Sequence, residues 1–196
     1  NTLGTHTPLF YDTPLELVSG KGVWLRSASG KRYLDAYNNV PHVGHSHPRV
    51  VRAVSEQLAT LNTNTRYLQD QLIEYAEALT ALLPEPLSVC FFTASGSEAN
   101  ELAIRLARTH TRQRDLIVMD AAYHGHTNTL IDISPYKHNG PGGLGAPDWV
   151  HTSPIPDVYR GAHKANDPQA GLKYARDVGA VIDRLRASGR GLCGYI

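Results

Sequence analysis

The stretch Ser88–His110, SVCFFTASGSEANELAIRLARTH, joins an apolar run to an amphipathic run through a turn of small residues. The apolar run predicts a buried strand over 88–93, and the spacing of apolar residues after the turn predicts a helix over 96–110. Ser95 is followed three residues later by Glu98, a capping box that fixes the start of this helix. The stretch therefore predicts a strand–turn–helix unit, the building block of a parallel sheet covered by helices.

The segments that follow continue the alternation of strands and helices. Apolar runs predict strands over 116–119, 148–154 and 192–196, and helical spacing predicts a long helix over 170–188. This order implies an α/β protein with a mostly parallel sheet between two layers of helices, a three-layer αβα arrangement. Ligands of such sheets bind beyond the carboxyl ends of the strands, so we expect a binding site where the loops leave the sheet.

The first third of the chain has a different pattern. Short alternating runs over 16–37 predict strands with a hairpin, and Pro48 suits the first position of a helix. A second helix is predicted over 69–83, where prolines end it. We therefore expect an N-terminal segment over 1–62, followed by the first part of a large αβα domain over 63–196.

The composition is that of an ordinary globular protein. Of the 196 residues, 41% are hydrophobic and 19% are charged, which argues against a disordered chain. The net charge of +1 argues against a nucleic-acid partner, and no apolar run is long enough to span a membrane. Cys90 and Cys193 lie in apolar runs, so we expect buried thiols in a reducing, cytoplasmic compartment.

The turn before the predicted helix has the features of an anion site. Gly96 lacks a Cβ atom, so a ligand can approach its N–H group closely. The N–H groups of Gly96 and Ser97 point out of the helix N-terminus and the Ser97 hydroxyl adds a donor, an arrangement that phosphates occupy. The alternative is a helix cap without a ligand, which Ser95 and Glu98 alone explain. The turn contains neither the GxxxxGK[ST] nor the GxGxxG motif.

A second loop, DAAYHGHT over 120–127, follows the next predicted strand. In a parallel sheet it leaves the same edge as the Gly96 turn, where Tyr123 can offer an aromatic face. A phosphate cradle beside an aromatic ring would suit a phosphorylated heteroaromatic ligand. The alternative is that Tyr123 and His124 only pack the loop.

Two further groups of polar residues are candidates for binding. His42, His45 and His47 lie close together, but no Asp, Glu or Cys accompanies them at ligand spacing, so we predict no metal site. Arg66, in a short loop between two predicted helices, can bind a phosphate or a carboxylate as a fork. The alternative for Arg66 is a surface arginine without a ligand.

Together these stretches resemble the class III pyridoxal-phosphate-dependent aminotransferases. SGSEANELAIRLAR is similar to their phosphate-binding strand–turn–helix, YHGHT to the loop whose ring stacks on the cofactor, and YLDAYNNVPHVGHSHPRVV to their N-terminal segment. Within the family, NNVPHVGHSHP, LNTNTRYL, LIDISPYK and PIPDVYRG are similar to the ethanolamine-phosphate phospho-lyase branch. The resemblance covers nearly the whole chain.

The resemblance implies the type I pyridoxal-phosphate-dependent transferase fold, truncated here to its N-terminal part, and a homodimer with active sites at the subunit interface. For pyridoxal 5'-phosphate it implies a set of cofactor-binding residues: Ser95, Gly96, Ser97, Tyr123, His124 and Gly125. On the substrate side it implies three residues: Asn39, Val40 and Arg66.

The family also needs a Schiff-base lysine and an aspartate on the pyridine nitrogen, both well downstream of the phosphate-binding turn. The lysines of this chain do not lie in a strand-end context similar to that motif; they are Lys21, Lys31, Lys137, Lys164 and Lys173. We therefore expect this chain to be the N-terminal part of a longer enzyme, and we assign it no catalytic residue.

For the whole enzyme, the resemblance implies a phospho-lyase that converts a small phosphorylated amine such as phosphoethanolamine into an aldehyde, ammonia and phosphate. The first alternative is an ω-aminotransferase that transfers an amino group to a keto acid. Arg66 does not separate the two, because an arginine suits phosphate and carboxylate equally. The second alternative is a non-catalytic binding or interaction domain.

Overall fold

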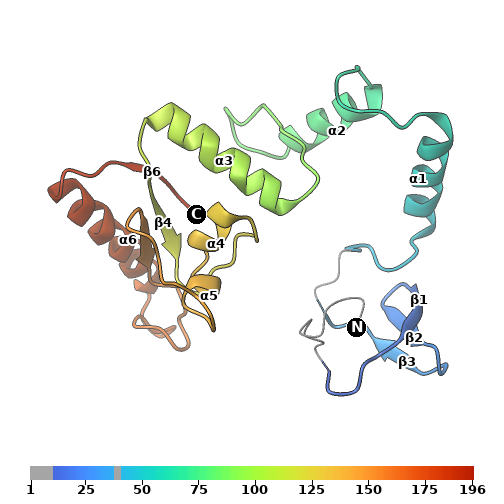
Figure 1. Ribbon diagram of the computed structural model, residues 1–196, viewed down its shortest axis with the longest axis horizontal. Coiled ribbons are helices and arrows are strands. Elements are labelled where there is room, and N and C mark those ends of the chain that lie inside the picture. Colours follow the sequence, from blue (N-terminus) through green and yellow to red (C-terminus); the bar gives the residue numbers. More distant parts are fainter. Residues whose placement is uncertain (1–10, 38–40) are drawn as a thin grey trace. The chain divides into compact units, whose positions relative to one another are not determined.

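The computed structural model describes residues 11–37 and 41–196 (Figure 1). The chain divides into two compact units, Asn1–Tyr75 and Ala76–Ile196. The predicted domain boundary after residue 62 stays a prediction. Among the helices of the described residues, none combines the length and the apolar character needed to cross a bilayer.

The first unit contains a small antiparallel sheet. Its strands are β1 (Leu17–Lys21), β2 (Trp24–Ser27) and β3 (Arg32–Leu34), in the order β1-β2-β3. β2 and β3 pair across the turn at 28–30, which confirms the predicted hairpin. The alternating side chains of these short strands leave most of the sheet exposed.

Two helices follow this sheet in the chain. α1 (Pro48–Thr60) starts at its proline, as predicted, because the fixed φ of proline suits the first helical position. Its N-cap, His47, forms no side-chain hydrogen bond, and the Ser46 hydroxyl instead donates to a backbone carbonyl of β1 at 3.0 Å. α2 (Asp70–Thr80) ends three residues before the predicted end. Pro84 disfavours the helical conformation of the residue that precedes it, so the helix ends before this proline.

The second unit contains the predicted parallel sheet. β4 (Asp115–Met119) lies in the centre, with β5 (Val150–Ser153) and β6 (Leu192–Tyr195) on either side. Both neighbours run parallel to β4. The carboxyl ends of the three strands therefore meet at one edge of the sheet, where the loop after β4 emerges.

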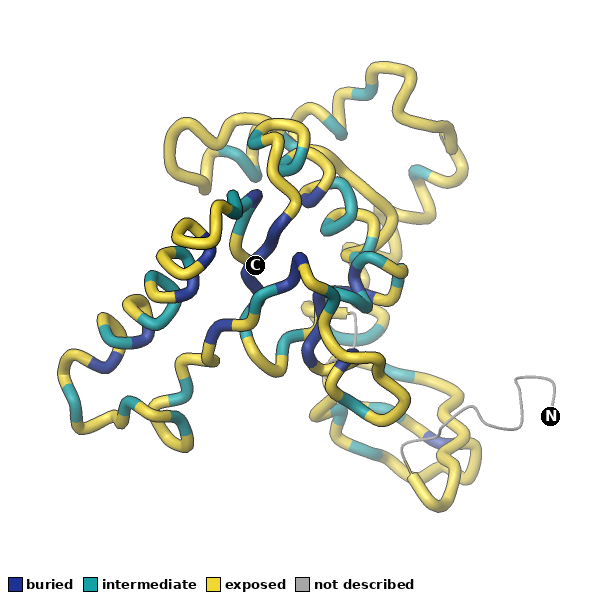
Figure 2. The backbone as a smooth tube through the Cα atoms, turned by 60° about the vertical axis from the view of Figure 1, so that its left-hand side comes forward, coloured by how far each residue is buried: buried dark blue, intermediate teal, exposed yellow. Residues whose placement is uncertain are grey.

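Helices cover both faces of this sheet, which confirms the three-layer αβα arrangement. α3 (Gly96–Thr111) and α4 (Asn128–Asp132) contribute to a hydrophobic cluster on one face. α6 (Ala170–Ala187) contributes to a cluster on the other face, and its buried residues recur along one side of the helix (Figure 2). The four-residue helix α5 (Pro135–His138) follows α4 and carries two buried residues.

The side chains of β4 alternate between the two clusters. Leu116 and Val118 pack with Ile104 of α3, whereas Ile117 packs with Leu185 of α6. Every one of these side chains is buried. An unbroken apolar strand such as β4 is typical of a sheet covered on both faces.

The segment 88–93 is not a strand, so this part of the prediction is wrong. Val89 and Phe91 are 76% and 64% exposed. An apolar run becomes a strand only when a neighbouring strand pairs with its backbone, and the described strands β4, β5 and β6 pair among themselves. Cys90, in this segment, is half-buried, whereas Cys193 is buried in β6, where burial raises the pKa of its thiol.

A network of charged side chains ties the amino-terminal ends of the strands together. The Asp115 carboxylate accepts hydrogen bonds from Arg190 Nε at 2.5 Å and from His151 Nε2 at 2.8 Å. Burial raises the pKa of Asp115, but the hydrogen bonds from Arg190 and His151 outweigh burial, so the pKa lies below its ordinary value of 3.8. The network therefore stabilises the sheet only while Asp115 is ionised.

We expect acid to destabilise the fold through Asp115. A carboxyl with a lower pKa in the folded chain than in the unfolded chain stabilises the fold above the unfolded pKa, and this stabilisation is lost as the pH falls below 3.8. Asp115→Asn should flatten this acid dependence and lower the free energy of unfolding at neutral pH by about 2 kcal/mol, because charge-assisted hydrogen bonds are lost.

Urea unfolding at neutral and acidic pH measures both effects. Asp183→Asn is the matched control, since this aspartate lies on the exposed side of α6. Equal acid dependence in the wild type and in Asp115→Asn would contradict the role of the network.

Candidate functional site

The start of α3 forms as the capping box predicts. Ser95 is extended, with φ −154° and ψ 159°, and its hydroxyl oxygen accepts a hydrogen bond from the Glu98 N–H at 3.2 Å. The Glu98 carboxylate accepts a bond from the N–H of Ala94 at 2.7 Å, one residue before the position that a capping box usually uses. The two bonds fix Gly96 as the first helical residue.

The first two N–H groups of α3 are open to a ligand. Those of Gly96 and Ser97 have no acceptor among the residues that the structure describes. A Cβ atom built on Gly96 would meet no atom within 4 Å beyond its chain neighbours and its own helix, so the space beside this residue is open. The helix dipole adds partial positive charge at this end. The turn can therefore bind an anion of the size of a phosphate through backbone donors.

The loop after β4 packs directly on this first turn of α3. At Gly125 the backbone has φ +142°, and a Cβ atom would lie 2.5 Å from Leu130 Cδ1 and 2.6 Å from Ser97 Oγ. Both the conformation and the space exclude a side chain at this position. Glycine thus lets the loop after β4 contact the Gly96 turn, as predicted, although the strand predicted before that turn does not form.

Hydrogen bonds hold the loop after β4 against α3. The N–H of His126 donates to Ser97 Oγ at 3.4 Å, and Asn100 Nδ2 donates to the carbonyl of His124 at 2.8 Å. The Thr127 hydroxyl donates to a carboxylate oxygen of Glu101, one turn along α3 from Ser97. The sequence patterns did not predict the roles of Asn100, Glu101 and Thr127. For Asn100 and Glu101 the signal is their spacing of three and four residues from Ser97, which places them on its face of the helix; Thr127 lies in the loop and has no such signal.

Tyr123 and His124 differ in exposure. The Tyr123 ring is 54% exposed and meets the Tyr136 ring edge-on, with centroids 6.2 Å apart and 80° between the planes. His124 is half-buried, and desolvation lowers the pKa of its ring, so the ring is neutral at pH 7. Its Nε2 atom is buried without a hydrogen-bond partner in the described residues. The loop thus presents an open aromatic face and a neutral imidazole.

The described structure does not test the predicted substrate residues. Asn39 and Val40 lie outside the described residues. Arg66 belongs to the first unit, where its side chain is exposed and its N–H donates to the Asn64 side chain at 3.0 Å. Asn39, Val40 and Arg66 therefore stay predictions.

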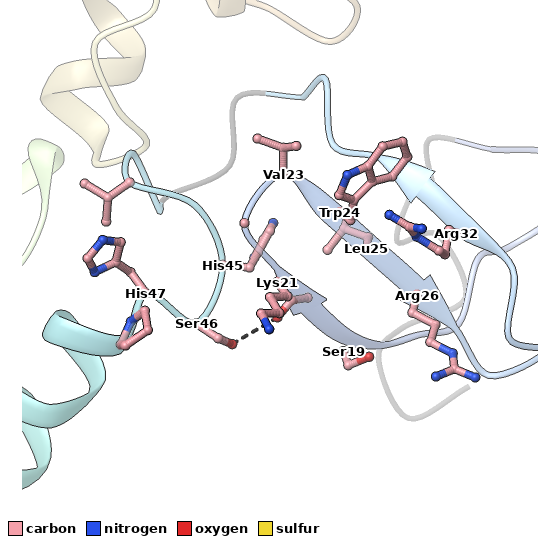
Figure 3. Close-up of a pocket in the computed structure, with 14 residues that line it drawn as sticks. Ser19, Lys21, Val23, Trp24, Leu25, Arg26, Arg32, His45, Ser46 and His47 are labelled. Carbon is pink, nitrogen blue, oxygen red and sulfur yellow. Dashed lines mark hydrogen bonds between the residues drawn. The ribbon is translucent and has the colours of Figure 1, made fainter.

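The first unit contains a groove of about 850 Å³ (Figure 3). The segment with His45 and His47 lies on one side of it, and the β1–β2 pair lies on the other. The Nε2 atom of His45 is 2.6 Å from the Asp35 carboxylate. The sequence did not reveal this partner, because Asp35 lies ten residues from His45. Within residues 11–37 and 41–196, no group of three His, Cys, Asp or Glu side chains is placed to hold a metal ion.

We expect Gly125→Ala to detach the loop from α3. The added methyl group would clash with Ser97 and Leu130, so the free energy of unfolding should fall by about 3 kcal/mol. Gly142→Ala is the matched control, because φ there is also positive, at +78°, but a Cβ atom meets nothing within 4 Å. It should cost only about 1 kcal/mol. Urea unfolding measures both, and equal losses would refute the packing role of Gly125.

Comparison with known proteins identifies the family of this chain. The sequence matches the family described as aminotransferase class-III over residues 10–186. A Drosophila melanogaster protein named alanine–glyoxylate aminotransferase 2-like is 48% identical over 99% of this chain and 40% of its own length. Ethanolamine-phosphate phospho-lyase homolog 1 of Caenorhabditis elegans is 40% identical over 100% of this chain and 44% of its own length.

A solved structure is similar over the same extent. A phospholyase from Arthrobacter, in complex with phosphoethanolamine, matches with a TM-score of 0.85 and 46% identity, over 99% of this chain and 45% of its own. The chain thus spans less than half the length of these relatives. The match confirms the expected type I fold. The chain belongs to the class III aminotransferase family, whose members are pyridoxal-phosphate-dependent enzymes.

Proposed function

We propose that the whole protein containing this chain is a phospho-lyase that acts on a small phosphorylated amine such as phosphoethanolamine. The observation that carries the proposal is the 46% identity to the Arthrobacter phospholyase, which was solved with phosphoethanolamine. The reaction removes a proton from the amine-bearing carbon. The bond between the neighbouring carbon and the phosphate oxygen then breaks, and its electron pair remains on the phosphate. Addition of water then gives an aldehyde, ammonia and inorganic phosphate.

The turn at the start of α3 fits the phosphate of pyridoxal 5'-phosphate. The N–H groups of Gly96 and Ser97 supply two donors without acceptors among the described residues, and the open space at Gly96 admits a phosphate oxygen. Ser97 Oγ already accepts from the N–H of His126, so the hydroxyl proton remains free to donate. Ser95 acts by holding the helix start in place.

The loop after β4 would form the wall of the same site. The exposed face of Tyr123 suits stacking on the pyridine ring, and His124 and Gly125 shape the backbone behind it. His124 stays neutral and so adds no charge to this wall. When bound, pyridoxal phosphate supplies an electron sink for the carbon that loses its proton. We assign no catalytic base to these 196 residues, and Asn39, Val40 and Arg66 stay candidates for the substrate side.

An ω-aminotransferase is the second candidate function. It is favoured by the 48% identity to the Drosophila relative, which is named as an aminotransferase. The α3 site supports both candidates, because each reaction uses the same cofactor. What separates them is the second substrate, since an aminotransferase needs a keto acid and a lyase does not.

We also propose that the whole protein is a cytoplasmic homodimer with shared active sites. The exposed apolar side chains before α3, among them Val89 and Phe91, support a further protein surface at this point. The half-buried Cys90 and the buried Cys193 are both free, which suits a reducing compartment. Light scattering of the purified protein measures the number of subunits.

We expect the purified whole protein to release inorganic phosphate from phosphoethanolamine without any keto acid. Acetaldehyde and ammonia should appear in amounts equal to the phosphate, because one C–O bond breaks for each molecule that reacts. A colorimetric phosphate assay, with and without pyruvate or glyoxylate, measures this directly. Amino transfer that depends strictly on a keto acid, with no phosphate released, would favour the aminotransferase and contradict the lyase.

We expect Gly96→Ala to weaken cofactor binding without unfolding the protein. The methyl group would occupy the approach to the first N–H groups, and the dissociation constant should rise about tenfold, a loss of about 1.4 kcal/mol. Gly171→Ala is the matched control, since this glycine lies in the first turn of α6 and is equally open. Cofactor absorbance after dialysis measures retention, and thermal unfolding checks the fold. Equal retention in both variants would contradict the assignment of the α3 site.

A further inference from the structure

α5 is fastened to the loop that carries Tyr123. The N–H of Tyr136 donates to the carbonyl of Ala122 at 3.1 Å, and the N–H of His124 donates to the hydroxyl of Ser134 at 2.9 Å. These bonds hold the residues on both sides of Tyr123. Figure 1 shows α4 and α5 close to the end of β4, where that loop leaves the sheet. These two hydrogen bonds, one to a backbone carbonyl and one to a side-chain hydroxyl, therefore fix the position of α5 beside Tyr123.

The ammonium group of Lys137, in α5, lies near the rings of Tyr123 and Tyr136. Its Nζ atom lies 5.7 Å from the centre of the Tyr123 ring and 5.3 Å from the centre of the Tyr136 ring. Both distances are near the outer limit of a cation–π contact, so the rings orient the ammonium group without enclosing it. The side chain is exposed.

The other lysines of the second unit already bind oxygen atoms. Lys173 pairs with the Asp167 carboxylate at 2.5 Å, and Lys164 donates to the carbonyl of Tyr159 at 3.1 Å. Lys137 has no ion pair and no hydrogen bond from its ammonium group in the described part of the chain. It is thus a cation beside the Tyr123 ring that the described residues do not neutralise.

We propose that Lys137 binds the phosphate of the substrate and of the released inorganic phosphate. This inference rests on the proposed function, in which the phosphate of an amine must lie near the cofactor ring that Tyr123 faces. A lysine ammonium is a point charge that suits a phosphate dianion, and it stabilises the negative charge that remains on the phosphate when the C–O bond breaks. The α3 turn does not serve this purpose, because the phosphate of the cofactor would occupy it.

Binding of inorganic phosphate to the whole protein loaded with pyridoxal phosphate tests the proposal. Lys137→Met removes the charge and keeps the length of the side chain, whereas Lys137→Arg keeps the charge. We expect Lys137→Met to raise the dissociation constant for inorganic phosphate and the KM for phosphoethanolamine by about 10- to 100-fold. Lys137→Arg should retain most of the binding, and cofactor absorbance should be unchanged in both variants.

Lys164→Met is the matched control, since it removes an exposed lysine of the same unit that contacts neither ring. If Lys137→Met binds inorganic phosphate as tightly as the wild type, the proposal is wrong, whatever the activity. If the wild type releases no phosphate from phosphoethanolamine, the proposed function fails, and calorimetry with inorganic phosphate still decides the role of Lys137. A loss in Lys164→Met equal to that in Lys137→Met would also refute a specific contact.

Discussion

The close approach of Gly125 to the first turn of α3 is the constraint on which the candidate site depends. A side chain at this position would overlap Ser97 and Leu130, so the contact exists only because residue 125 has no Cβ atom. The hydrogen bonds from His126 and Asn100 follow from this contact, because they join the same two segments. As a result, the first N–H groups of α3, which have no acceptor among the described residues, and the exposed Tyr123 ring belong to one hydrogen-bonded group, although α3 and β4 separate the two segments in the chain.

The hydroxyl group of Ser134 extends this hydrogen-bonded group to α5. Its hydroxyl accepts from the N–H of His124 and donates to the carbonyl of Leu130, so one buried side chain links the loop, α4 and α5. The sheet also packs against α4, since Leu130 of α4 shares a hydrophobic cluster with Val118 of β4. The core thus determines where Lys137 can lie, even though Lys137 itself is exposed. A surface charge placed by a buried network is better suited to binding than one on a free loop, because less conformational entropy is lost when a ligand binds.

The sequence was sufficient for features that depend on local spacing. The capping box predicted the start of α3, and the alternation of apolar segments predicted the parallel sheet and its two helical layers. Features that depend on a distant partner could not be predicted. The run 88–93 has the composition of a strand but finds no partner strand among the described residues. The pair of His45 with Asp35, ten residues apart, and the position of Lys137 over two rings arise only from the folded chain.

The turn at the start of α3 does not separate the two proposed functions, lyase and aminotransferase. In the proposed site, backbone N–H groups would bind the cofactor phosphate in the same way whichever reaction follows, so Gly96 and Ser97 would carry no information about the second substrate. A phosphorylated amine brings a dianion, whereas a keto acid brings a planar carboxylate with a single charge. A compact ammonium such as that of Lys137 favours the dianion, because its attraction grows with the ligand's charge, while a carboxylate gains more from the flat fork of an arginine. In its proposed role, Lys137 beside Tyr123 is therefore the feature that bears most directly on which reaction the whole protein catalyses.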